Sequence, residues 1–315
     1  MILNEEDQRI RALRPPKRQV DAWQPLGAIV EEERRPDGNL ERALTVFLAG
    51  SECPFTCGFC DLWRYTLDGP TPEGALPAQL RLALGKSDVG SLRRIKLYNA
   101  SNFFDPRAVP IRDLDAIAQL VAPFAGVTVE SHARTVGPRC PDFADRLAGR
   151  LEVAIGLETI HPAALPRLNK KMSLPDFARA ARFLRDQGIA LRVFVLVGTP
   201  FVPPEEAVAW SVRSVEYALE HGAAVVALIP ARGGNGEMER LAAVGEFQPP
   251  VLADLEAVLE RSLQLGGGVM TADLWDADRL PAYPICQMAR LDRIGRMNAT
   301  GQAPAPLACS VCRAA

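Results

Sequence analysis

The sequence predicts an α/β fold, a partial (β/α)6 TIM-like barrel, from three observations. Short apolar runs alternate along the chain with segments of helical period. The runs are apolar throughout, as parallel strands covered on both faces are. Polar residues collect directly after the runs, at the strand ends where barrel enzymes carry their chemistry. We expect one main domain over residues 43–275, preceded by an N-terminal extension (1–42) and followed by a C-terminal cysteine-containing segment (276–315).

The N-terminal extension is polar and rich in Arg, Glu and Pro. Its local basic run consists of Arg9, Arg11, Arg14, Lys17 and Arg18. A solvated extension, or a helix packed outside the core, is the simpler interpretation. An arm that contacts RNA phosphates is the alternative, although aromatic residues are not interleaved with the cations.

Strands and helices follow in alternation. Strands are predicted at residues 44–50, 93–99, 127–132, 151–157, 191–198 and 223–230, and a glycine turn at 266–268 precedes a final strand at 269–273. Helical periodicity appears after Pro110, after Ser173 as N-cap, after Pro204, and again from Leu252 to Leu263. This alternation indicates parallel βαβ units with right-handed crossovers.

Bulk composition excludes some classes of protein. The net charge of −2 gives no general attraction to nucleic acid or to anionic membranes. No apolar stretch approaches the roughly 20 residues that span a bilayer. The first residues lack the order of a signal peptide. We therefore expect a cytoplasmic protein without a membrane partner, and the clustering of six of its seven cysteines indicates metal binding rather than disulfides.

The strongest local signal is the cysteine loop, residues 53–60 (CPFTCGFC), which follows the first predicted strand. The thiolates of Cys53, Cys57 and Cys60 can bind three irons of a [4Fe–4S] cluster and leave the fourth iron open to a reagent. A zinc site is the alternative, but three ligands leave structural zinc one short.

A second group of cysteines lies near the C-terminus. Cys286, Cys309 and Cys312 could hold a second iron–sulfur cluster, or zinc with a further ligand, and ordinary thiols are the simpler interpretation. Cys140 is expected to be a buried or loop thiol, or that further ligand.

The CxxxCxxC spacing, with Phe59 before the third cysteine, resembles the radical S-adenosylmethionine enzymes over residues 44–265. A narrower similarity, to the group containing the radical subunit of archaeosine synthase and the radical domain of Elongator protein 3, is carried by four stretches: IKLYNASNFFDPRAVP (95–110), VESHAR (129–134), VAIGLETIHPAALPRLNKKM (153–172) and LRVFVLVGTPF (191–201).

The resemblance implies roles for particular residues around S-adenosylmethionine. Asn99 and Ser101 would lie beside the methionyl amino group, in place of the family's glycine-rich pattern. Glu158 matches the residue that hydrogen-bonds the ribose, and Lys170 the one that faces the methionyl carboxylate. Glu130 and Arg134 would complete this polar shell, or pair with each other. Glu158 could instead form a surface ion pair, and Lys170 could be solvated.

The implied activity is reductive cleavage of S-adenosylmethionine to a 5′-deoxyadenosyl radical, which abstracts hydrogen from a substrate. That substrate would be a tRNA nucleobase or its precursor, or a free small molecule, and the electron would come from a reductant such as flavodoxin or ferredoxin. Sulfur insertion with an auxiliary cluster is one alternative, and a non-catalytic zinc-binding interaction protein is another. No catalytic side chain and no oligomeric state is predicted. His132 is a candidate either for substrate binding or for a structural hydrogen bond.

Overall fold

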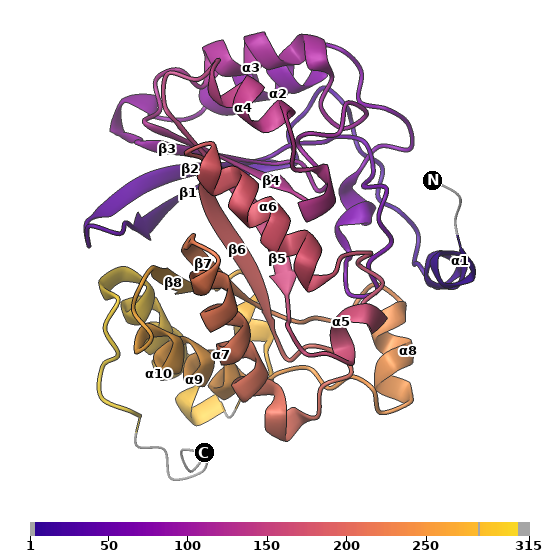
Figure 1. Cartoon of the computed structure of the whole chain (residues 1–315), viewed down its shortest axis with the longest axis vertical. Coiled ribbons are helices and arrows are strands. Elements are labelled where there is room, and N and C mark those ends of the chain that lie inside the picture. The colour runs from indigo at the N-terminus through magenta and orange to yellow at the C-terminus, as the bar shows by residue number, and fades with distance from the viewer. Residues whose placement is uncertain (1–3, 283, 308–315) are drawn as a thin grey trace.

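Eight strands form one curled sheet in chain order, with helices packed on its outside (Figure 1). The computed structural model describes residues 4–282 and 284–307. Strands β1 and β2 are antiparallel, and every later strand runs parallel to the one before it. The strands are β1 (Gly27–Arg34), β2 (Leu40–Phe47), β3 (Arg94–Tyr98), β4 (Gly126–Ser131), β5 (Arg150–Glu158), β6 (Ala190–Val197), β7 (Ala223–Pro230) and β8 (Val269–Ala272). The helices are α1 (Glu5–Ala12), α2 (Ala75–Leu84), α3 (Leu114–Leu120), α4 (Arg139–Ala144), α5 (Ala164–Arg167), α6 (Leu174–Asp186), α7 (Pro204–Glu220), α8 (Glu237–Ala243), α9 (Leu252–Leu263) and α10 (Pro284–Thr300).

The predicted α/β barrel is confirmed. Strands β2 to β7 are the six predicted parallel strands, and β8 is the predicted final strand. Strand β1 was not predicted. It lies among residues expected to form a polar extension, and its side chains alternate between half-buried and exposed positions, as on an edge strand.

The strand pleat divides the buried side chains into two sets. One set, which includes Leu44, Ile95 and Val153, faces outward and forms the main hydrophobic core with the surrounding helices. The other set faces the inside of the barrel and is strongly polar. Because alternate residues of a strand point to opposite faces, each strand contributes to both sets.

A buried charged network fills part of the barrel interior. Lys96 on β3 donates to Glu31 and Glu33 on β1, at 2.7 and 2.6 Å. Arg192 on β6 donates to Glu33 at 3.0 Å and to Glu152 on β5 at 2.8 Å. Burial alone would raise the pKa of Glu33, but Arg192 and Lys96 lower it to about 2. These charges are tolerated inside the fold because each has an oppositely charged partner.

Helix α10 packs against α9 and both edge strands, β1 and β8. Its Arg293 is almost fully buried and donates to Glu256 and Glu260 of α9 at 3.0 and 3.1 Å. The helix therefore connects the two ends of the open sheet.

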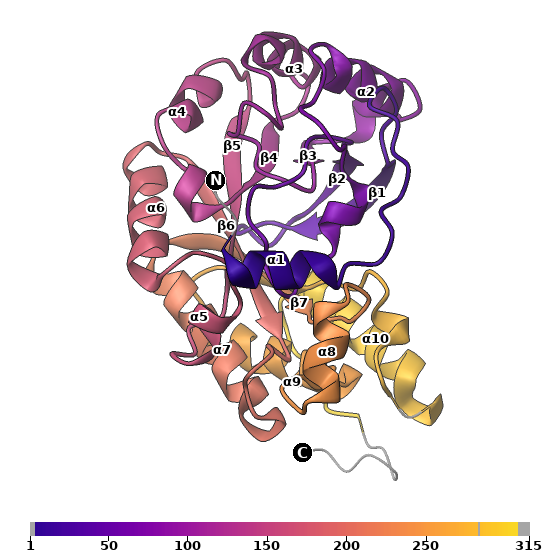
Figure 2. The ribbon, with the colours of Figure 1, turned by 90° about the vertical axis from the view of Figure 1, so that its right-hand side faces the viewer.

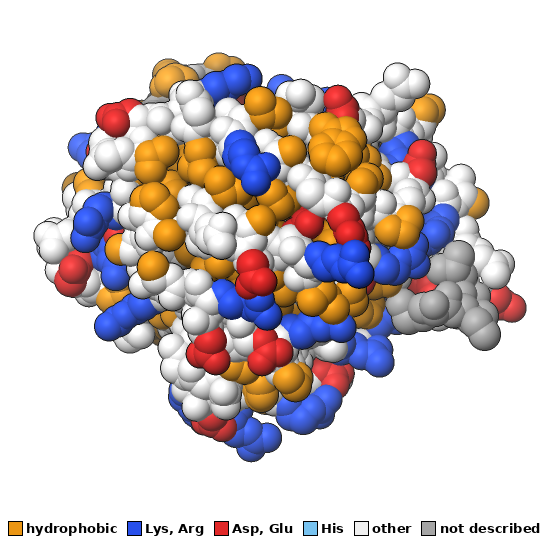
Figure 3. Space-filling model, turned by 90° about the horizontal axis from the view of Figure 1, so that it is seen from above, with side chains coloured by type: hydrophobic (Ala, Val, Ile, Leu, Met, Phe, Trp, Pro, Cys, Tyr) orange, Lys and Arg blue, Asp and Glu red, His pale blue; other side chains and the backbone are white. Residues whose placement is uncertain are grey.

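On the face shown in Figure 3, basic and acidic side chains are interspersed among apolar ones. Of the helices in the described ranges, none combines the length and hydrophobicity needed to cross a bilayer.

Candidate functional site

The cysteine loop begins where β2 ends, at the carboxyl edge of the parallel strands. The exit from β2 is fixed by Gln79 of α2, which is fully buried. Its side chain accepts a hydrogen bond from the Ala49 amide at 2.8 Å and donates to the Ala49 carbonyl at 2.9 Å. The Gln79 side chain thus makes the two backbone hydrogen bonds that a neighbouring strand would make with Ala49, and the chain leaves the sheet at this point.

Backbone groups of the cysteine loop are held by two distant segments and by one residue just after the loop. The Gly58 amide donates to the Leu168 carbonyl at 2.9 Å. The Asn235 side chain donates to the carbonyls of Gly58 and Cys60, at 2.8 and 3.3 Å. The Trp63 indole donates to the Cys60 carbonyl at 3.1 Å. This irregular loop is therefore fixed by tertiary hydrogen bonds rather than by secondary structure of its own.

The three thiols lie in a protected but not sealed environment. Cys53, Cys57 and Cys60 are partly exposed, and Asn102 donates to the Cys53 sulfur at 3.2 Å. Burial raises the pKa of all three thiols, that of Cys57 to about 12, although Lys170 opposes the shift at Cys57. Since metals bind thiolates, metal uptake here must release protons.

Within the described residues, no three His, Cys, Asp or Glu side chains are grouped so that they could hold a single metal ion. A cubane cluster makes a different demand, because each thiolate binds a different iron.

The turn after β3 carries unsatisfied polar groups. The side-chain oxygen and nitrogen of Asn99 and the hydroxyl of Ser101 are buried without a hydrogen-bond partner in the described part of the chain. Glu130, at the end of β4, accepts the Asn99 amide at 2.8 Å and holds this turn. Burial raises the pKa of Glu130 to about 7, although the amides of residues 99–101 oppose the shift. Because unpaired buried polar atoms are costly, those of Asn99 and Ser101 fit a site for a polar ligand group.

Glu158 and Lys170 form a buried ion pair, with 2.6 Å between Lys170 Nζ and Glu158 Oε1. The pair lies directly over Gly156. A Cβ at that position would be 1.9 Å from Glu158 Oε1 and 2.5 Å from Lys170 Nζ, so any side chain there would displace the pair. Lys170 Nζ also lies 5.8 Å from the Phe59 ring centre in the cysteine loop. Burial lowers the pKa of Lys170, but the negative charges of Glu158, Cys57 and Cys60 together raise it above its ordinary value.

His132 is held by hydrogen bonds and ring stacking within the protein. Its Nδ1 accepts the Arg134 amide at 3.1 Å, so Nε2 carries the proton and donates to the Lys170 carbonyl at 2.9 Å. The ring stacks on Phe55 of the cysteine loop with 3.8 Å between centres. Burial and the neighbouring Lys170 lower the pKa of His132 to about 3. His132 is therefore a neutral connector between the cysteine loop and the segment that carries Lys170.

Comparisons with known proteins agree with the barrel fold. No family model matches the chain. An uncharacterised protein of Methanocaldococcus jannaschii is 22% identical over 260 residues, 78% of this chain and 71% of that protein. The archaeosine synthase subunit beta of Methanosarcina acetivorans is 23% identical over 237 residues, 72% of this chain and 68% of that protein. Methylornithine synthase, a solved structure, has a TM-score of 0.51 at 15% identity and covers 80% of this chain and 67% of its own.

The shared barrel and the cysteine spacing after β2 agree with the resemblance seen in the sequence. The chain has the fold and the cysteine motif of the radical S-adenosylmethionine enzymes. The resemblance seen in the sequence is confirmed.

Two residues that the radical S-adenosylmethionine resemblance assigned to the polar shell, Arg134 and Glu130, do not contact each other. Arg134 is exposed and donates weakly to the Lys171 carbonyl, at 3.4 Å. Glu130 is occupied by the backbone of the turn after β3, and no ion pair joins it to Arg134 in the described structure. Their proposed contacts with the cofactor stay predictions.

The second cysteine group cannot be assembled from the described residues. Cys286 is buried in the first turn of α10, and Cys140 is buried in α4. Cys309 and Cys312 lie outside the described residues. The auxiliary metal site stays a prediction.

Several residues around the cysteine motif were not predicted from the sequence. Asn102 contacts both Cys53 and the His132 amide, Asn235 holds the cysteine loop, and Gly156 makes room for the ion pair. A further signal is backbone conformation: Ala100, Glu158, Asn169 and Lys171 all have φ between +52° and +66°. Such strain in residues other than glycine clusters at functional sites.

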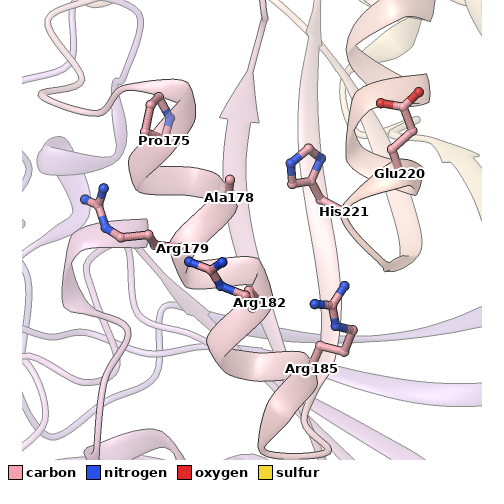
Figure 4. A pocket seen from close by; sticks show the side chains of 7 residues that line it. All are labelled: Pro175, Ala178, Arg179, Arg182, Arg185, Glu220 and His221. Carbon is pink, nitrogen blue, oxygen red and sulfur yellow. The ribbon is translucent and has the colours of Figure 1, made fainter.

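Two adjoining hollows lie outside the barrel along α6. One, of about 420 Å³, is lined by Arg179, Arg182 and Arg185 opposite His221 at the end of α7 (Figure 4). The other, of about 740 Å³, shares Arg179 and Arg182 and reaches Arg134. Together these four arginines form the arginine stripe.

Proposed function

We propose that the chain is a radical S-adenosylmethionine enzyme that holds a [4Fe–4S] cluster on Cys53, Cys57 and Cys60 and acts on a nucleobase in tRNA or on its precursor. The observation that supports this most strongly is that the three-cysteine loop follows β2 and contacts, through Asn102 and Cys53, the turn that carries the unpaired polar atoms of Asn99 and Ser101.

The polar groups divide the work of binding the cofactor. Asn99 and Ser101 receive the methionyl amino group, Lys170 faces the methionyl carboxylate, and Glu158 accepts from the ribose hydroxyls. Glu130 contributes indirectly, because it fixes the turn that positions Asn99. When bound, the cluster supplies the electron that cleaves S-adenosylmethionine to methionine and a 5′-deoxyadenosyl radical, which takes hydrogen from the substrate.

The substrate class has two supports. One relative is the archaeosine synthase subunit beta, at 23% identity. The arginine stripe runs from Arg134, just after β4, along the outside of α6, where guanidinium groups can contact a phosphate backbone. A free small molecule is the alternative substrate. The electron donor is a reductant such as flavodoxin or ferredoxin.

The test is anaerobic reconstitution of the full chain, followed by reduction with dithionite in the presence of S-adenosylmethionine. We expect about four irons per protein at this site and formation of 5′-deoxyadenosine. Cys57→Ala abolishes that product, whereas Cys140→Ala, which removes a buried thiol of α4, retains it. Product formation by Cys57→Ala, or colourless protein with one zinc, would overturn the proposal.

A further inference from the structure

We propose that residues 4–18 act as a clamp that keeps the cysteine loop in its ligand-binding conformation. The clamp consists of α1 and the segment after it, and it includes the basic run of the N-terminal extension. The proposal rests on the proposed function only in taking the cysteine loop as the cluster site. Figure 2 shows α1 lying in front of the sheet, directly above α8.

Helix α1 is too short and polar to be stable alone. Asn4 caps it in a capping box with Asp7, and Ile10 is its one buried apolar side chain, 3% exposed. A Cβ at Gly58 would lie 3.9 Å from Ile10 Cδ1 and 3.6 Å from Glu237 Cγ. The helix thus lies on the cysteine loop, and its remaining contacts there are polar and specific.

The first polar contact runs through Asn169. Its side-chain nitrogen donates to Asp7 Oδ1 at 2.8 Å and to the Thr56 carbonyl in the cysteine loop at 2.6 Å. Lys171 lies 3.5 Å from the same Asp7 carboxylate. Asp7 therefore orients the amide that holds the cysteine loop one residue before Cys57.

The second contact runs through α8. Arg9 donates to both oxygens of Glu237, at 2.5 and 2.9 Å, and Arg240 pairs with the same carboxylate at 2.8 Å. The Glu237 side chain is 3% exposed, so it depends on these partners. Glu237 begins α8 two residues after Asn235, the residue that holds the carbonyls of Gly58 and Cys60.

The third contact lies at the start of the cysteine loop. Glu52 precedes Cys53 and pairs with Arg14 at 2.8 Å and with Lys17 at 3.3 Å. The Arg14 guanidinium also lies 4.6 Å from the ring centre of Trp63, whose indole holds the Cys60 carbonyl. Arg9, Arg14 and Lys17 of the basic run thus face acidic groups of this protein.

The experiment uses full-length, metal-free protein and measures alkylation of each cysteine by iodoacetamide with mass spectrometry. The variant is Arg9→Gln with Glu52→Gln, which removes two of the three contacts. Arg112→Gln, which breaks an exposed pair with Glu73 elsewhere, is the control. Buried Cys140 is an internal reference, since it reacts only when the core opens.

We expect Cys53, Cys57 and Cys60 to react about tenfold faster in the variant, which corresponds to about 1.4 kcal/mol less free energy for local opening of the cysteine loop. Cys140 should react at its control rate. Unchanged rates at the three cysteines overturn the clamp, and so does an equal acceleration at Cys140, because that reports general unfolding. Iron uptake by the wild-type chain is measured separately. Its absence would count against the proposed function and leave the alkylation result to decide the clamp.

Discussion

At the scale of single residues, some polar groups of the site have hydrogen-bond or ion-pair partners within the protein, and others have none in the described residues. Glu158 and Lys170 pair at 2.6 Å, and both ring nitrogens of His132 are engaged. The side chains of Asn99 and Ser101 have buried polar atoms without partners in the described residues. Leaving such atoms unpaired costs folding free energy, which a ligand's hydrogen bonds would recover.

Gly156→Ala tests the ion pair without altering any charge. The added methyl would displace Glu158 and Lys170, because its Cβ falls within 1.9 and 2.5 Å of their polar atoms. We expect the dissociation constant of S-adenosylmethionine to rise at least about tenfold, by equilibrium dialysis against the reconstituted protein, with iron content retained. Gly137→Ala is the control, since nothing described lies within 4 Å of its added Cβ. Equal affinities in the two variants would argue against a cofactor role for the pair.

At the scale of elements, sequence pattern predicted the parallel strands well, because each is a short apolar run between turn residues. Strand β1 and helix α10 did not show such a pattern. Both are amphipathic elements at the open edges of the sheet, and their position depends on tertiary contacts. The cysteine loop could be located from spacing alone. Its supports Gln79, Asn169 and Asn235 could not, because they bind backbone carbonyls far away in sequence.

The part of the arginine stripe that lies on α6 allows a test of tRNA binding. Replacing Arg179 and Arg182 by Glu should weaken binding of a tRNA transcript, measured by fluorescence anisotropy. The slope of log affinity against log salt should become shallower by about one for each phosphate that the variant no longer binds. Arg112→Glu, a charge reversal at an exposed site beside α3, is the control and should change neither quantity. If affinity and slope are unchanged in the α6 variant, a free small molecule becomes the better substrate.

At the scale of the whole molecule, the barrel contains two polar regions, the candidate site and an interior network of ion pairs. The carboxyl ends of the strands carry the candidate site, whereas the interior network joins β1, β3, β5 and β6 through Glu33, Lys96, Glu152 and Arg192. Since β1 is an edge strand, these ion pairs tie it to the strands inside the sheet.

The interior network predicts an acid-dependent stability. The pKa of Glu33 is lowered from 4.5 to about 2, so its stabilising contribution is present above about pH 4.5 and is lost as pH falls toward 2. At pH 7 we expect Glu33→Gln to reduce the free energy of unfolding by up to about 3 kcal/mol in urea titrations. The difference from wild type should shrink between pH 4.5 and 2. Glu32→Gln, at an exposed position on the same strand, should change little. A pH-independent difference would contradict this interpretation of the network.

The distance along the chain between the cysteine loop and its supports has a consequence for biogenesis. Residues 53–60 leave the ribosome early, yet Leu168, Asn169, Asn235 and Glu237, which hold the loop directly or through α1, are synthesised more than a hundred residues later. A nascent chain that ends before residue 168 has its thiols but lacks all four of these residues, and the set is complete only when Glu237 at the start of α8 has been added. We therefore expect the three thiols to reach their observed arrangement only after α8 has been translated, so that the proposed cluster would be inserted late.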